Sequence, residues 1–154
     1  MEPEIREISE FKIVGLQCQT EMGKTMEDLP KLWDEYMPRM GEIKNRIDEK
    51  VGYGVSIAED PESKKFTYLA GVGVTDDSTI PEGMTSITIK EGKYVVFTHK
   101  GSLTKIGETY DFIWNEWLPK SGKKIDVRAP CLERYDERFK DDENSIMEIL
   151  FLLK

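Results

Sequence analysis

The segment Leu32-Trp-Asp-Glu-Tyr-Met-Pro-Arg39 returns in altered form as Ile113-Trp-Asn-Glu-Trp-Leu-Pro-Lys120, 81 residues further along the chain (113 − 32). An apolar residue, Trp, an acid or amide, Glu, an aromatic residue, an apolar residue, Pro and a base recur in the same order. Internal repeats decide how a whole fold is assembled. This repeat predicts a duplication whose two halves, about 1–78 and 82–154, meet across a pseudo-twofold axis and enclose a ligand at their seam.

Both copies of the repeated segment have the spacing of an amphipathic helix, with apolar residues three and four apart. The first stripe consists of Leu29, Leu32, Trp33, Tyr36, Met37 and Met40. The second consists of Ile106, Tyr110, Ile113, Trp114, Trp117 and Leu118. Pro30 fits an early helical position, and Pro38 predicts a break because proline removes a backbone donor.

Apolar runs typical of strands flank each helix. They cover 10–19, 53–58 and 66–74 in the first half, and 93–98, 131–135 and 146–153 in the second, with a short candidate at 86–89. Polar segments at 59–65 and 76–83 predict a turn and the joint between the halves. The fold class is therefore α+β, a duplicated β-α-β-β repeat forming a mostly antiparallel sheet with two main helices, in one domain spanning 1–154.

Composition excludes several classes of function. The formal charge is −8, from 30 acids against 22 bases, and no basic stripe is present, so direct nucleic-acid binding is not expected. No apolar stretch reaches the roughly 20 residues of a membrane span and no signal peptide opens the chain, so we expect a cytoplasmic protein. Cys18 and Cys131 stand alone, and the acids lack His or Cys companions, so neither a metal nor a cofactor is expected.

Glu148 is the main candidate for chemistry, because it lies in the apolar run Ile146-Met-Glu-Ile-Leu-Phe-Leu-Leu153. Burial of an unpaired carboxylate costs several kcal/mol or raises its pKa. At an offset of 80 its counterpart in the first half is Tyr68, so the duplication predicts that these two side chains approach each other. In the alternative, Glu148 lies on a solvated face or pairs with an arginine such as Arg134.

Aromatic side chains on the two helices are the next candidates. Packing and pocket lining are both open for Trp33 and Trp114, whereas Tyr36 and Trp117, beside the prolines, favour the rim of a pocket. Tyr110 belongs to the same set. Large aromatic faces beside one carboxylate suit a flat cation.

Two further signals favour structural roles. His99 is the single histidine, and no nucleophile-elbow pattern accompanies it, so a buried or surface structural role is expected. Gly71-Val-Gly-Val lacks the strand-to-helix context of a phosphate loop, so it favours close strand packing.

Taken in order, these motifs resemble the GyrI-like family of small-molecule-binding domains, which also occur as effector domains of AraC- and MerR-type regulators. The resemblance rests on 32–39, on Tyr53-Gly-Val with Tyr68-Leu-Ala-Gly-Val, on the Gly101-Ser-Leu loop before the Trp-rich helix, and on Met147-Glu-Ile. It implies a groove between the two helices that binds lipophilic, aromatic, often cationic compounds. It also assigns Glu148 and Tyr68 to the site, with the aromatics Trp33, Tyr36, Trp114 and Trp117.

Three functions are open. The first is a binding module that captures hydrophobic cations, with Glu148, Tyr68 and the aromatics as ligand-binding residues. The second, implied by stand-alone members of the family, is a hydrolase of cyclopropane-bearing, DNA-alkylating natural products with Glu148 and Tyr68 as catalytic residues. The third is a protein partner of DNA gyrase, although the acids are spread along the chain rather than clustered.

Overall fold

The computed structural model describes residues 2–58, 60 and 62–154. The predicted turn at 59–65 includes residues 59 and 61, which lie outside the described residues. The elements are β1 (Glu4–Ile8), β2 (Phe11–Glu21), α1 (Thr25–Tyr36), the 3₁₀ helix η1 (Met37–Glu42), β3 (Gly52–Ile57), β4 (Lys65–Val74), β5 (Thr85–Ile89), β6 (Gly92–Lys100), the 3₁₀ helix η2 (Leu103–Lys105), α2 (Ile106–Phe112), the π-helix η3 (Ile113–Trp117), α3 (Leu118–Ser121), β7 (Cys131–Tyr135) and β8 (Ile146–Leu152).

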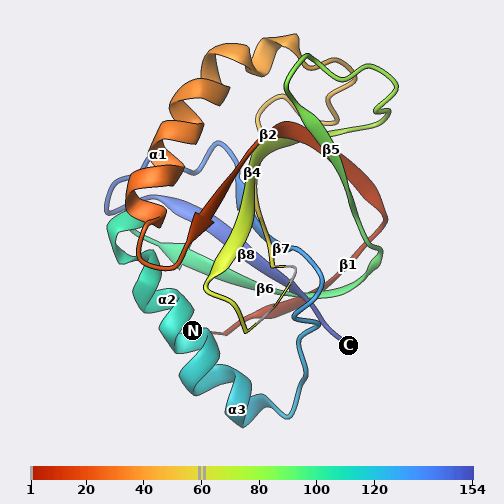
Figure 1. The fold of residues 1–154 in the computed structure, drawn as a ribbon. Helices are drawn as coiled ribbons and strands as arrows, with labels where there is room; N and C mark the ends of the chain where they lie inside the picture. Colours follow the sequence, from red (N-terminus) through yellow and green to blue (C-terminus); the bar gives the residue numbers. More distant parts are fainter. Residues whose placement is uncertain (1, 59, 61) are drawn as a thin grey trace.

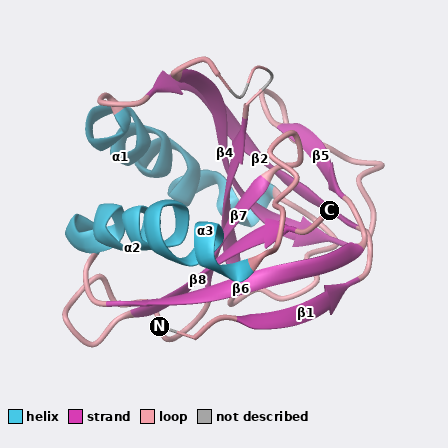
Figure 2. Cartoon of the chain, turned by 90° about the horizontal axis from the view of Figure 1, so that it is seen from below, coloured by secondary structure: helices cyan, strands magenta, loops and turns pink. Residues whose placement is uncertain are grey.

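The eight strands form one antiparallel sheet in the order β1-β6-β8-β7-β3-β4-β2-β5. The sheet curls strongly, and α1 and α2 lie side by side on its outer surface (Figure 1, Figure 2). We call this surface the helix face and the opposite, enclosed surface the inner face. The predicted α+β fold with two main helices is confirmed.

The duplication extends through the whole fold. The strand order reads the same from either end, with β5, β2, β4 and β3 equivalent to β1, β6, β8 and β7. Starting residues of β1 and β5, β2 and β6, α1 and α2, and β4 and β8 are all 81 apart. Each half is therefore β-β-α-β-β rather than the predicted β-α-β-β. The extra strands are exchanged, because β1 pairs with β6 and β5 pairs with β2.

Both faces of the sheet are buried over most of its width. On β8, Met147, Ile149 and Phe151 pack beneath α2 and η3, whereas Leu150 and Leu152 join the cluster on the inner face. A separate cluster lies between α1 and strands β2 and β4. Because successive strand residues point to opposite faces, a charged residue on these strands enters a buried environment on either side.

A glycine pair allows β2 and β4 to approach closely. Gly15 and Gly71 are register partners in this ladder. A Cβ atom on Gly71 would lie 2.4 Å from the carbonyl oxygen of Val14, too close for any side chain. The prediction that Gly71-Val-Gly-Val serves strand packing is confirmed.

Most residues of the predicted stripes pack against the sheet, but Met37 and Trp114 are exposed, and α1 also differs from its prediction at one end. Helix α1 begins at Thr25, earlier than expected, so Pro30 lies in its second turn and not near its start. It ends at Tyr36, where a 3₁₀ helix containing Pro38 follows, as predicted. Within the described residues, no helix is long and apolar enough to cross a bilayer.

Tyr36 lies in the core and not at a rim. It is the last residue of α1 and is 1% exposed, and its hydroxyl has no hydrogen-bond partner among the described residues. Since a buried, unpaired polar group costs about 1–3 kcal/mol, we expect Tyr36→Phe to leave the free energy of unfolding unchanged or to raise it by about 1 kcal/mol. Urea denaturation measures this change, and a loss above about 1 kcal/mol would show that the hydroxyl has a bonding partner.

Candidate functional site

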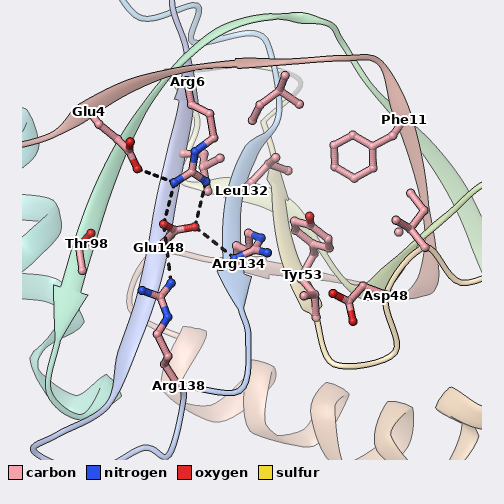
Figure 3. A pocket seen from close by; sticks show the side chains of 15 residues that line it. Glu4, Arg6, Phe11, Asp48, Tyr53, Thr98, Leu132, Arg134, Arg138 and Glu148 are labelled. Atoms are coloured by element: carbon pink, nitrogen blue, oxygen red, sulfur yellow. Dashed lines mark hydrogen bonds and ion pairs between the residues drawn. The ribbon is translucent and has the colours of Figure 1, made fainter.

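Glu148 points from β8 into the inner face, where three arginines surround it (Figure 3). Arg6 donates to Oε1 at 3.1 Å and to Oε2 at 3.0 Å, which makes a bidentate pair. Arg134 donates to Oε1 at 3.4 Å, and Nη2 of Arg138 lies 3.8 Å from Oε2. The alternative in which Glu148 pairs with Arg134 is confirmed. We call these four residues the arginine cluster.

The predicted approach of Glu148 to Tyr68 is wrong. Tyr68 packs on the helix face beneath α1, and Glu148 lies on the other side of the sheet. The error lies in the offset of 80, because the repeat is 81 residues long and its equivalent of Tyr68 is Ile149 (149 − 68). A slip of one residue moves a strand side chain to the opposite face.

The arginines keep Glu148 ionised. Burial by itself would raise its pKa, but the hydrogen bonds and charge of Arg6 and the charges of Arg134 and Arg138 outweigh burial, so the pKa lies below its usual value. Nearby, hydrogen bonds from Arg138 lower the pKa of Asp136 to about 2. The charges on the inner face are thus paired with one another, while the three arginines also remain partly exposed to solvent.

These depressed pKa values predict acid lability. A carboxylate whose pKa is lowered by folding contributes stability above its unfolded pKa and loses it as the pH falls. We therefore expect the free energy of unfolding to fall between about pH 4 and pH 2, and Asp136→Asn to flatten this part of the profile. Urea denaturation at a series of pH values is the measurement. Identical acid slopes for Asp136→Asn and the wild type would contradict this assignment.

Glu133 is the carboxylate that the structure places beside Tyr68. It lies on β7 with its side chain on the helix face and is 8% exposed. The hydroxyls of Tyr68 and Tyr135 donate to Oε1 at 3.0 and 2.9 Å, and that of Tyr110 donates to Oε2 at 2.6 Å. We call these four residues the Glu133 cluster. It joins β4, β7 and α2 at the centre of the molecule.

A glycine on the intervening strand makes the cluster possible. β3 lies between β4 and β7, and Gly54 is the register partner of Glu133. A Cβ atom on Gly54 would lie 1.9 Å from the hydroxyl oxygen of Tyr68 and 3.0 Å from Oε1 of Glu133. Tyr68 therefore reaches across β3 through space that any other residue would fill.

The charge of Glu133 is hydrogen-bonded but has no counter-ion. Burial, followed by the negative charge of Glu133, raises the pKa values of Tyr68, Tyr110 and Tyr135 well above 10, so these phenols remain protonated donors. No ion pair within 4.0 Å in the described part of the chain includes Glu133. The cluster thus carries a buried negative charge surrounded by neutral groups.

Two rows of edge-to-face aromatic contacts adjoin the cluster. The ring of Tyr135 lies 5.7 Å from that of Trp33 and 4.8 Å from that of Phe139. Phe151 lies 6.5 Å from Tyr110 and 5.4 Å from Trp114, which is 39% exposed. Among the predicted aromatics, Tyr68 and Tyr110 touch Glu133 and Trp33 contacts its partner Tyr135. Trp114 lies further out, and Trp117 packs on the core ring of Phe97 at 5.0 Å.

Glu133 was not predicted as a site residue because its sequence neighbours are charged and polar. The segment Glu133-Arg-Tyr-Asp-Glu-Arg138 has the composition of a solvated strand end. The available signal of burial was its position in the strand. Glu133 lies between Cys131 and the aromatic Tyr135 at two-residue spacing, so its side chain shares a face with both. Alternation alone does not reveal that three tyrosines from distant segments converge there.

His99 is a structural residue, as predicted. It is 2% exposed on the helix face. Its Nδ1 lies 2.6 Å from Oγ1 of Thr109, and its Nε2 lies 3.0 Å from the carbonyl oxygen of Ser102. Both ring nitrogens are engaged in tying β6 to the start of α2.

Comparison with known proteins agrees with this architecture. Residues 1–154 match the GyrI-like small molecule binding domain. The chain belongs to this family. The transcriptional regulator BrlR of Pseudomonas aeruginosa is 33% identical over 153 residues, which cover 97% of this chain and 54% of that regulator. The chain thus spans about half the length of this relative.

Two solved structures show the same fold. SAV2435 bound to tetraphenylphosphonium has a TM-score of 0.79 and 22% identity, and the match covers 100% of this chain and 94% of that chain. A hydrolase encoded by lin2189 from Listeria innocua has a TM-score of 0.57 and 12% identity, with 99% and 92% of the two chains covered. At identities this low, the two structures support only the fold of this GyrI-like domain.

The role of Gly54 leads to a mutational prediction. In Gly54→Ala the new methyl group overlaps the Tyr68 hydroxyl, so we expect the free energy of unfolding to fall by about 1–3 kcal/mol and the bond to Glu133 to break. Gly52→Ala on the same strand is the matched control, because its Cβ meets nothing closer than the Gly71 carbonyl oxygen at 3.8 Å. Urea denaturation compares the two, and equal stabilities would refute the close packing at Gly54.

Proposed function

We propose that this GyrI-like domain binds small lipophilic cations with aromatic surface, and that Glu133 is their counter-ion. The observation that carries the proposal is a carboxylate 8% exposed, held by three tyrosine hydroxyls, with no basic partner among the described residues. Hydroxyl donors satisfy the oxygens but leave the charge uncompensated, and a buried uncompensated charge is costly. A bound cation removes that cost.

The surrounding rings favour the same ligand class. Aromatic faces attract cations through their quadrupoles and supply a large apolar area. Trp33 and Tyr135 lie in contact on one side of Glu133, and Tyr110 with Phe151 lies on the other. Trp114, partly exposed beside Phe151, marks the side from which we expect a ligand to enter. Because Glu133 is nearly covered, entry requires some of these rings to rotate away.

The comparisons support the proposal at two levels. The family is one of small-molecule-binding domains. SAV2435, which has a similar fold, was solved with tetraphenylphosphonium, a lipophilic cation of this chemical class. The similarity to half of the regulator BrlR also suggests that ligand binding by this domain serves an effector role.

Ligand titration tests the proposal. Loss of a charge-assisted contact costs about 1.5–3 kcal/mol, so Glu133→Gln should raise the Kd for rhodamine 6G and for tetraphenylphosphonium by about 10- to 150-fold. The Kd for triphenylphosphine oxide, a neutral compound of related shape, should change much less. Fluorescence anisotropy and calorimetry provide the two measurements.

Glu148→Gln is the matched control, because it removes the other buried glutamate on the opposite face of the sheet. We expect it to leave the affinity for both cations within about threefold of the wild type. If Glu148→Gln weakens cation binding and Glu133→Gln does not, the ligand is on the inner face and the proposal fails.

Hydrolysis of cyclopropane-bearing natural products was predicted with Glu148 and Tyr68 as catalytic residues. We propose it as a second candidate function with Glu133 in place of Glu148. The observation in its favour is the direct 3.0 Å bond between Tyr68 and Glu133, which supplies the carboxylate–tyrosine pair that such chemistry requires. In an enzyme, Glu133→Gln would retain some binding and lose turnover, whereas a binding module shows no turnover in either protein. Interaction with DNA gyrase also stays a prediction.

A further inference from the structure

A cavity lies on the inner face of the sheet, separated from the Glu133 cluster by the sheet itself. Its volume is about 760 Å³, within the range typical of small-molecule sites. Strands β1, β2, β3, β4, β6, β7 and β8 contribute to its walls, together with the loops around Asp48 and Arg138. The proposed cation site uses none of these side chains.

The two ends of this cavity differ in chemistry. The arginine cluster forms one end, and Figure 3 shows Arg6, Arg134 and Arg138 directed at Glu148 from different strands and loops. Phe11 and Tyr53 stand across from it, with their rings 5.6 Å apart. Apolar side chains lie along the remaining wall: Ile8, Ile47, Val51, Leu132 and Leu150. This layout fits a molecule with one charged end and an apolar, partly aromatic body.

Three guanidinium groups converge at the charged end of the cavity. Three guanidinium groups share only two well-buried carboxylates, Glu148 at 7% and Asp136 at 16% side-chain exposure. Glu4 is 61% exposed, so solvent screens its bond to Arg6. Asp48 is also exposed, and it lies at the aromatic end of the cavity. The three arginines thus face three carboxylates in all, of which only Glu148 and Asp136 are well buried.

Donor groups are also available there. A guanidinium has five N–H groups in a planar fork that matches carboxylates and other oxyanions. Arg138 uses Nε and Nη2 to bind Asp136, and Arg134 uses Nη1 to bind Asp136 and Glu148. Within the described residues, Nε and Nη2 of Arg134 and Nη1 of Arg138 donate to no carboxylate, so these N–H groups can turn toward a bound anion.

We propose that this cavity binds a small organic anion, an aromatic carboxylate or sulfonate, with its charge at Arg134 and Arg138 and its rings against Phe11 and Tyr53. The inference is independent of the cation site, because the two sites use opposite faces of the sheet and opposite charges. The domain would then recognise two chemically distinct classes of ligand.

A matched pair of fluorescent probes tests the charge. 8-Anilino-1-naphthalenesulfonate carries the sulfonate that N-phenyl-1-naphthylamine lacks, while the ring systems are alike. We expect the anion to bind the wild-type protein at least about tenfold more tightly than the neutral amine, as for one charge-assisted contact. Equal affinities for the two probes would overturn the proposal.

Variants locate the site. Arg134→Gln and Arg138→Gln should each raise the Kd of the sulfonate about tenfold or more, with little effect on the neutral amine. Arg39→Gln is the matched control, because Arg39 also pairs with a carboxylate, that of Glu42, away from the cavity. Glu133→Gln should leave sulfonate binding unchanged. If Arg39→Gln weakens sulfonate binding as much as the cavity variants do, the proposal fails.

If the arginine variants do not fold, NMR of the wild-type protein tests where the sulfonate binds. In ¹⁵N-labelled protein, the sulfonate should shift the amide resonances of Asp48, Gly73 and Thr98, which line the cavity. Tetraphenylphosphonium should instead shift resonances around Glu133, so failure of one site is distinguishable from failure of the other. Sulfonate-induced shifts confined to α1, α2 and the Glu133 cluster would overturn the assignment of the anion to the inner face.

Discussion

Burial of both faces of one curled sheet is the constraint on which the rest of this structure depends. Every charged residue on a central strand must be compensated on its own side, because solvent reaches neither face freely. On the inner face Glu148 meets three arginines, so its charge is stabilised within the protein. On the helix face Glu133 meets only tyrosine hydroxyls. Glu148 is therefore paired with basic groups within the protein, whereas Glu133 has no basic partner among the described residues.

The two repeated halves form the scaffold, and the candidate site lies where equivalent positions of the two halves carry different residues. Strands β3 and β7 occupy equivalent positions at the centre of the sheet and pair with each other. Glu133 on β7 faces Gly54 on β3, so one half provides the carboxylate and the other provides the empty space beside it. Tyr68 fills that space from the first half and Tyr110 arrives from the second. A perfectly symmetric pair of halves would place two like charges or two glycines there.

Much of this fold was predictable because it repeats. The 81-residue offset identified both helices, the equivalent strands of the two halves and the antiparallel α+β class. The exchanged edge strand β1 was missed, because Glu4–Ile8 carries charges at three of its five positions and its partner is in the other half. The predicted approach of Glu148 to Tyr68 was wrong for a related reason. An offset of 80 instead of 81 inverts the face of a strand residue, so Glu148 was matched to Tyr68, whereas Glu133 has no acidic counterpart from which to infer it.

Glu133 and Arg134 are neighbours on β7 and point to opposite faces, one toward the proposed cation site and the other toward the proposed anion site. β7 pairs with both β3 and β8. The strand is thus held on both sides, and a shift that adapts it to one ligand also moves the residue that meets the other ligand. Coupling between two binding sites is reciprocal by thermodynamic necessity. If occupancy of the helix face alters affinity on the inner face, the inner ligand must alter cation affinity by the same factor, with β7 as the physical connection.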